Sequence, residues 1–213
     1  MTMTEPRLRA DACRNRERIL AAACEALVEH GPEVSIEEIA RRAGVGNATI
    51  YRRFCGRHDL LHHVGLEVLG VLTEEAERAR AEEVDALSAL RRFAHRASNR
   101  SLAAVLPMVY GQTADDEPLH AARERLLGLV KNLMTSAQTT GMMRNDLCLG
   151  DFLTALAKLT RPLPGSPRPV VDTVRRQIDL LIDGLRTQRC CTCPERPASS
   201  RTHAGPVGST TDD

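Results

Sequence analysis

The side chains best suited to chemistry lie close together near the N-terminus. Polar and basic residues of the types that contact DNA follow one another there: Asn47, Thr49, Tyr51, Arg52 and Arg53. Short polar side chains bond backbone phosphates, and asparagine and arginine also reach base edges in the major groove. Residues 39–57 hold five arginines and no acid, whereas a solvated helix face usually carries both signs. This stretch therefore favours a partner that carries phosphates.

Three predicted helices would hold these side chains in place. Residues 14–30 show helical periodicity up to a Gly-Pro stop. Ser35 and Glu38 form an S-x-x-E capping box that opens a second, short helix. Gly44 can adopt the positive φ of a tight turn before a third helix at residues 47–54. Two short helices joined by a glycine turn, with a third helix across them, predict a helix-turn-helix unit.

The stretch IEEIARRAGVGNATIYRRFCGRHDLL resembles the DNA-binding domain of the TetR (tetracycline-repressor-like) family of bacterial regulators. The matching positions are Ile39-Ala40, Ala43-Gly44-Val45, Thr49-Ile50-Tyr51, Phe54, Arg57 and Leu60-Leu61. In two places the sequence departs from the family pattern. Gly46 stands where a serine cap is common, so Asn47 is expected to share the capping role. Cys55-Gly56 replaces a more usual polar or proline turn.

The resemblance implies a role for each DNA-contacting residue. Thr49 and Tyr51 would contact the DNA backbone, and Ser35 would cap the second helix close to a phosphate. Arg57, where the family usually has lysine, would hold a phosphate at the start of the fourth helix. The variable recognition positions, which would read bases, are Asn47, Ala48, Arg52 and Arg53.

The rest of the chain is also predicted to be helical. A long helix is expected at residues 57–80, and later ones at residues 84–99, 102–110, 118–139, 151–159 and 170–186. The expected fold is therefore all-α, with an N-terminal three-helix domain joined by the long helix to a larger ligand-binding and dimerisation domain. The expected parts are a disordered arm (1–11), the DNA-binding domain (12–65, motif at 35–54), the regulatory and dimerisation domain (66–187) and a disordered tail (188–213).

The resemblance further implies a homodimeric repressor that a small-molecule effector releases from a pseudo-palindromic operator. The ligand would tilt the long fourth helix and separate two recognition helices from their ~34 Å spacing. Residues 151–159 and 170–186 would pack against their copies as the dimer interface. The candidate pocket residues, which are equally suited to an ordinary core, are Leu90, Phe93, Leu102, Val105, Met108, Val109, Leu126 and Met134.

Composition narrows the function classes. The 213 residues are 42% apolar and 2% aromatic, and 29 basic residues nearly cancel 28 acidic ones. No stretch approaches the about 18 unbroken apolar residues of a membrane span, and the N-terminus lacks the apolar segment of a signal peptide. We therefore expect a soluble, cytoplasmic protein. The resemblance to the TetR family implies that it is not an enzyme and needs no cofactor or metal. The few aromatic residues favour a flexible aliphatic or polar ligand over a stacked one.

Three alternatives remain open from the sequence. His58-Asp59-Leu60-Leu61-His62 resembles the H-E-x-x-H of zinc hydrolases, but Asp59 is shorter than glutamate and a third ligand would be needed. A metal- or redox-responsive regulator could use Cys190, Cys191, Cys193 and His203, although these residues stand in a tail predicted to be disordered. The third alternative is a protein that binds DNA without regard to its sequence.

Overall fold

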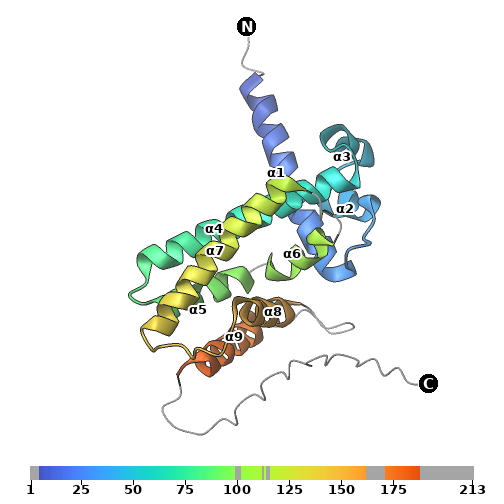
Figure 1. Cartoon of the computed structure of the whole chain (residues 1–213). Helices are drawn as coiled ribbons and strands as arrows, with labels where there is room; N and C mark the ends of the chain where they lie inside the picture. Colours follow the sequence, from blue (N-terminus) through green and yellow to red (C-terminus); the bar gives the residue numbers. More distant parts are fainter. Residues whose placement is uncertain (1–4, 99–101, 112, 114–115, 162–170, 188–213) are drawn as a thin grey trace, which may run out of the picture.

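Helices joined by short connections make up nearly all of the chain that the computed structural model describes, which is residues 5–98, 102–111, 113, 116–161 and 171–187 (Figure 1). They are α1 (Glu5–His30), α2 (Ile36–Ala43), α3 (Asn47–Arg53), α4 (Arg57–Glu82), α5 (Ala86–Ser98), α6 (Leu102–Tyr110), α7 (Glu117–Thr139), α8 (Leu149–Thr160) and α9 (Val171–Leu185). The predicted all-α fold is confirmed for these residues. None of the described helices has an apolar stretch long enough to cross a membrane.

The largest difference from the predicted boundaries is at the N-terminus. Helix α1 begins at Glu5, so residues 5–11, which were expected to be a disordered arm, are helical. The sequence explains this, because the segment contains arginine, alanine and leucine but no glycine, and Pro6 lies in the first turn, where its missing N–H leaves no bond unmade. The predicted disordered tail, residues 188–213, lies outside the described residues.

Local signals fix the turn between α2 and α3. The Ser35 hydroxyl accepts a hydrogen bond of 3.2 Å from the Glu38 backbone N–H, which is one half of the predicted capping box. The Glu38 carboxylate, which would form the other half, bonds Arg41 and Arg42 instead. Gly44 ends α2 with φ 64° and ψ 38°, a left-handed conformation that glycine adopts without strain. Helix α3 is capped by Gly46 without any side-chain hydrogen bond, so the expected capping role of Asn47 is wrong.

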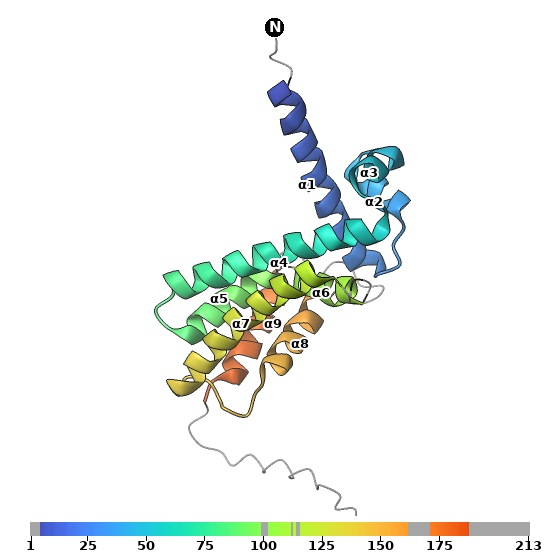
Figure 2. The same cartoon turned by 45° about the horizontal axis from the view of Figure 1, so that its top comes forward.

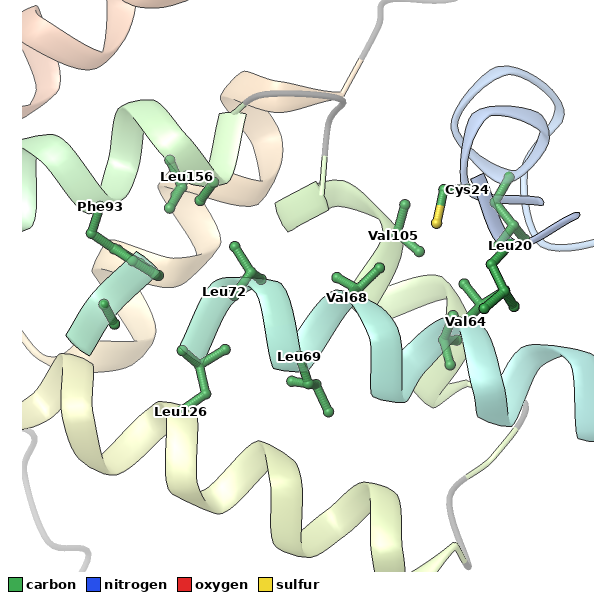
Figure 3. Close-up of a cluster of buried hydrophobic side chains, with 14 of the residues drawn as sticks. Leu20, Cys24, Val64, Val68, Leu69, Leu72, Phe93, Val105, Leu126 and Leu156 are labelled. Atoms are coloured by element: carbon green, nitrogen blue, oxygen red, sulfur yellow. The ribbon is translucent and has the colours of Figure 1, made fainter. Parts of the chain in front are cut away.

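Helix α4 runs through the middle of the molecule. Helices α1 to α3 lie at its N-terminal end, and α5 to α9 pack beside and below the rest of it (Figures 1 and 2). In Figure 3, Leu20 of α1 lies next to Val64 near the start of α4, while Leu72 further along faces the helices of the second half. These side chains belong to one continuous buried cluster, which joins the three N-terminal helices to the remaining six. The direction of α4 therefore determines where α3 lies.

The C-terminal helices are tied back to the bundle by polar contacts. Arg91 of α5 pairs with Asp183 of α9 at 2.5 Å, and His95 Nε2 lies 3.0 Å from Asp179 Oδ1. After α7, the backbone N–H of Arg144 donates to the carbonyl of Leu185 at 3.0 Å. These contacts hold α9 against α5 and the turn that follows α7.

Candidate DNA-binding surface and ligand cavity

Helix α3 brings most of the predicted DNA contacts together on one exposed surface. Tyr51 has 54% of its surface exposed, which leaves its hydroxyl and ring accessible to a partner. Four further predicted contacts on this helix are also exposed: Asn47, Ala48, Arg52 and Arg53. Thr49 is half-buried and its Oγ1 lies 3.4 Å from Nη2 of Arg52. This short helix therefore presents backbone-binding and base-reading types of residue side by side.

Buried side chains hold α3 in position beneath this surface. Ile50 and Phe54 are each only 1% exposed. The ring of Phe54 meets the ring of His63 on α4 edge to face, with their centroids 5.4 Å apart. At the start of α4 the carboxylate of Asp59 accepts a 2.8 Å hydrogen bond from the backbone N–H of Cys55. The exposed residues of α3 thus stand on a helix fixed to both the core and α4.

Arg57 and Ser35 lie outside α3 and have partners of their own. The Arg57 guanidinium donates hydrogen bonds to the carbonyls of Pro32 and Val34, in the connection between α1 and α2. Ser35 is exposed while its hydroxyl caps α2. Arg57 therefore fastens this connection to the start of α4, a role that its position in the sequence did not predict.

The acid-free stretch of sequence is not free of acids in space. Arg42 pairs with Glu29 of α1 at 2.6 Å, and Arg41 pairs with Glu38 at 2.6 Å. Hydrogen bonding from Arg41, with smaller contributions from Arg42, lowers the pKa of Glu38 to about 2, so this carboxylate stays ionised at neutral pH. Two of the five arginines of this stretch are therefore partly neutralised by acids from α1 and α2, which the spacing in the sequence did not show.

A cavity of about 420 Å³ lies between α4 and the helices α5 to α8. Its walls come from α4 to α8 and the connection before α7: Leu69, Leu72, Phe93, Ala97, Ala103, Leu106, Pro107, Tyr110, Thr113, Asp116, His120, Arg123, Leu126, Leu127, Leu153, Leu156 and Ala157. Two of the eight predicted pocket residues, Phe93 and Leu126, line it. The other six do not; they pack in or against the core: Leu90, Leu102, Val105, Met108, Val109 and Met134. The apolar periodicity of a helix predicts which side chains face the interior. It does not predict whether they pack against other side chains or border a cavity.

One end of the cavity is polar, and sequence reasoning did not find its residues. Asp116 caps α7 by accepting a 3.2 Å hydrogen bond from the N–H of Leu119, and its other oxygen is bonded to Nδ1 of His62 on α4. Burial acts to raise the pKa of Asp116, but these two hydrogen bonds hold it below its usual value. Burial raises the pKa of Tyr110 to about 12, and the Arg123 guanidinium lies 5.0 Å from the centre of its ring. The signal available in the sequence was only the N-cap type of Asp116.

A run of direct contacts joins this polar end to the end of α3. His62 is bonded to Asp116, and its ring meets the ring of His63 edge to face with 5.1 Å between the centroids. His63 in turn packs against Phe54, which follows the last residue of α3. A change at Asp116 therefore has a short physical route to the exposed helix.

The predicted metal alternatives gain no support from the described residues. Within these residues no group of three His, Cys, Asp or Glu side chains is arranged to hold a metal ion. Of the two histidines in the H-x-x-x-H spacing, His62 is bonded to Asp116. The residues of the proposed metal or redox sensor, Cys190, Cys191, Cys193 and His203, lie outside the described residues.

Comparison with protein families decides what kind of protein this is. Residues 19–64 match the model of the bacterial regulatory proteins of the tetR family, and residues 84–187 match the C-terminal domain of SbtR-like transcriptional regulators. The chain belongs to the TetR family. The predicted resemblance is confirmed, and membership of this family makes the chain a transcriptional regulator and not an enzyme.

Individual relatives agree with this family. The transcriptional repressor LfrR of Mycolicibacterium smegmatis is 34% identical over 109 residues, which are 51% of this chain and 56% of LfrR. The chain thus aligns with little more than half the length of that relative. The crystal structure of the TetR regulator SCO0520 of Streptomyces coelicolor is 29% identical, with a TM-score of 0.56 over 81% of this chain and 98% of SCO0520. A TetR regulator of Mycobacterium vanbaalenii is 27% identical, with a TM-score of 0.54 over 84% and 99% of the two chains.

Proposed function

We propose that this TetR-family protein is a homodimeric repressor that binds a specific operator and leaves it when a small molecule enters the cavity. The observation that carries the proposal is the exposed row of Asn47, Tyr51, Arg52 and Arg53 on a short helix anchored by buried Ile50. The exposure of these polar and basic side chains leaves them accessible to a DNA partner. Such a regulator works where the chromosome is, in the cytoplasm.

In this proposal α3 enters the major groove of the operator. Thr49 and Tyr51 bond the DNA backbone, and Ser35 lies near a phosphate at the N-terminus of α2. Base edges are read by Asn47, Ala48, Arg52 and Arg53. Arg57 acts on the same phosphates through the connection that it fastens. The boundary between the DNA-binding part and the regulatory part is placed at residues 65–66 of α4.

Replacing Glu38 with glutamine is expected to strengthen binding to DNA of any sequence. The change releases Arg41, whose side chain is 72% exposed, to neutralise a further phosphate. The plot of log affinity against log salt should then steepen by about 0.9. Titrations by fluorescence anisotropy at several salt concentrations measure this slope. Glu37→Gln, on the exposed side of the same helix, is the control for net charge, and an equal steepening in both variants would contradict the role of Arg41.

Two copies of the chain would meet through α8 and α9. Ala155 and Leu159 of α8 face Leu180 and Leu181 of α9 across a shallow groove, and Leu180 is 65% exposed. A second copy would remove this apolar surface from water. It would also supply the second recognition helix that a two-half-site operator requires, ~34 Å from the first. Burial of the apolar surface of α8 and α9 would therefore stabilise the dimer, and the dimer would present the two recognition helices that the operator requires.

The cavity would receive the effector. Its volume of about 420 Å³ lies within the range of small-molecule pockets, roughly 300–1,000 Å³. Because α4 forms one wall and also carries the helices of the DNA-binding end, a ligand that displaces α4 would move α3. The contacts from Asp116 through His62 and His63 to Phe54 offer a second connection between the cavity and α3.

Selection from a pool of random DNA duplexes tests this function. The full chain without ligand should enrich an inverted repeat whose half-sites are about 10 base pairs apart, one helical turn. Enrichment of a single half-site would contradict the dimer, and recovery of sequences without a common element would contradict operator recognition.

A further inference from the structure

We propose that the effector is a mainly apolar, aliphatic molecule carrying one cationic group. Asp116 binds this group, which takes the place of His62 as the partner of the carboxylate. This inference rests on the proposed function, because it names the class of ligand that the cavity takes. It also names the contact that ligand binding breaks.

The charge of Asp116 is proposed to select the ligand, because this side chain has little contact with water. Among the lining residues, Asp116 has a side chain that is only 9% exposed, whereas His120 and Arg123 are exposed at the surface. Water screens the exposed cations, but a carboxylate in an apolar wall interacts strongly with any charge placed beside it. The remaining walls are mostly leucine and alanine. An anionic head group would meet the Asp116 carboxylate and would be repelled.

His62 is the side-chain partner of Asp116 in this structure. A carboxylate with only 9% of its side chain exposed needs a donor, and here Nδ1 of His62 and the N–H of Leu119 provide the two bonds. The Leu119 bond belongs to the α7 cap and stays in place. The imidazole of His62 is 21% exposed, so it has room to leave, and an ammonium group can replace it with a charge-assisted hydrogen bond.

The replacement of His62 by the ligand also explains how ligand binding in the cavity would change the position of α3. Once released, His62 no longer joins α4 to the N-terminus of α7. Its ring contact with His63, and the contact of His63 with Phe54, are then free to change. Ligand recognition and loss of the inter-helix bond are thus one event at one carboxylate.

Three probes of equal chain length test the charge of the ligand: decylammonium, decanoate and decan-1-ol. Because the chain contains no tryptophan, isothermal titration calorimetry of the full chain is the suitable measurement. We expect decylammonium to bind at least tenfold more tightly than the other two. Decanoate or decanol binding as tightly as decylammonium, or no binding of any probe, would overturn the inference.

Two variants test the exchange, because they should act in opposite directions. Asp116→Asn should weaken decylammonium binding at least tenfold, while asparagine still caps α7. His62→Gln should strengthen it several-fold, because glutamine removes the competing imidazole. Glu124→Gln, an exposed acid on α7 that does not line the cavity, should leave the affinity unchanged. If Asp116 and His62 served only to hold the helices together, both variants would weaken binding, and that result would contradict the proposal.

Failure of this inference is distinguishable from failure of the proposed function. Operator binding by the ligand-free chain is measured in the same preparations. If the operator is bound but the probes or variants behave otherwise than expected, the ligand class is wrong and the repressor function stands. If the operator is not bound, the proposed function itself is wrong.

Discussion

Replacing Tyr51 and Arg52 together with alanine is expected to lower operator affinity by about 100-fold or more. Each contact of this kind contributes about 1–3 kcal/mol, and the two side chains stand next to each other on the exposed surface of α3. The loss should be greatest on the selected operator, since Arg52 is proposed to read bases. Fluorescence anisotropy with labelled operator and random duplexes at one salt concentration measures both affinities.

The same double variant should be as stable as the parent chain. Tyr51 is 54% exposed and Arg52 is exposed, so their removal opens no cavity in the core, and the free energy of unfolding should change by less than about 1 kcal/mol. Arg80→Ala, which removes an exposed arginine at the far end of α4, is the matched control and should bind the operator like the parent. An operator affinity within threefold of the parent would remove α3 from the interface.

Leu180→Glu is expected to convert the protein into a monomer that binds the operator about 1,000-fold more weakly. The leucine is 65% exposed in the single chain, so the change should not unfold it. In the proposed dimer the glutamate would be buried without a partner, at a cost of several kcal/mol for each copy. One recognition helix alone would then have to hold a half-site.

Sedimentation equilibrium measures the mass of this variant, and anisotropy measures its affinity. Val84→Glu provides the control, because Val84 is also a large exposed apolar residue but lies in the connection between α4 and α5 and does not line the groove between α8 and α9. A dimer that survives Leu180→Glu, or one that Val84→Glu breaks equally, would show that α8 and α9 are not the interface.

Features that depend on neighbours in the sequence were predictable. The Ser35 cap, the Gly44 turn and the helix-turn-helix that they enclose are encoded within a few residues, and the structure has them as predicted. Amphipathic periodicity placed α4 to α9 to within a few residues at each end for the same reason.

Features that depend on distant partners were not predictable. Glu29 neutralises Arg42 from another helix, 13 residues away in sequence, and His62 meets Asp116 across 54 residues. No periodic pattern reports such pairs, because they arise only when the helices pack. The same limit applies to the cavity: Leu90 and Phe93 lie on the same inward face of α5, yet only Phe93 borders the open space.

Sequence-specific binding is tested by the ratio between two affinities of the chain without added ligand, one for the selected operator and one for a random duplex of equal length. Both are measured at about 150 mM salt, where non-specific phosphate contacts are weak. A sequence-specific regulator is predicted to show a ratio of about 1,000 or more. A ratio close to one would contradict operator recognition and would leave a protein that binds DNA through its phosphates alone.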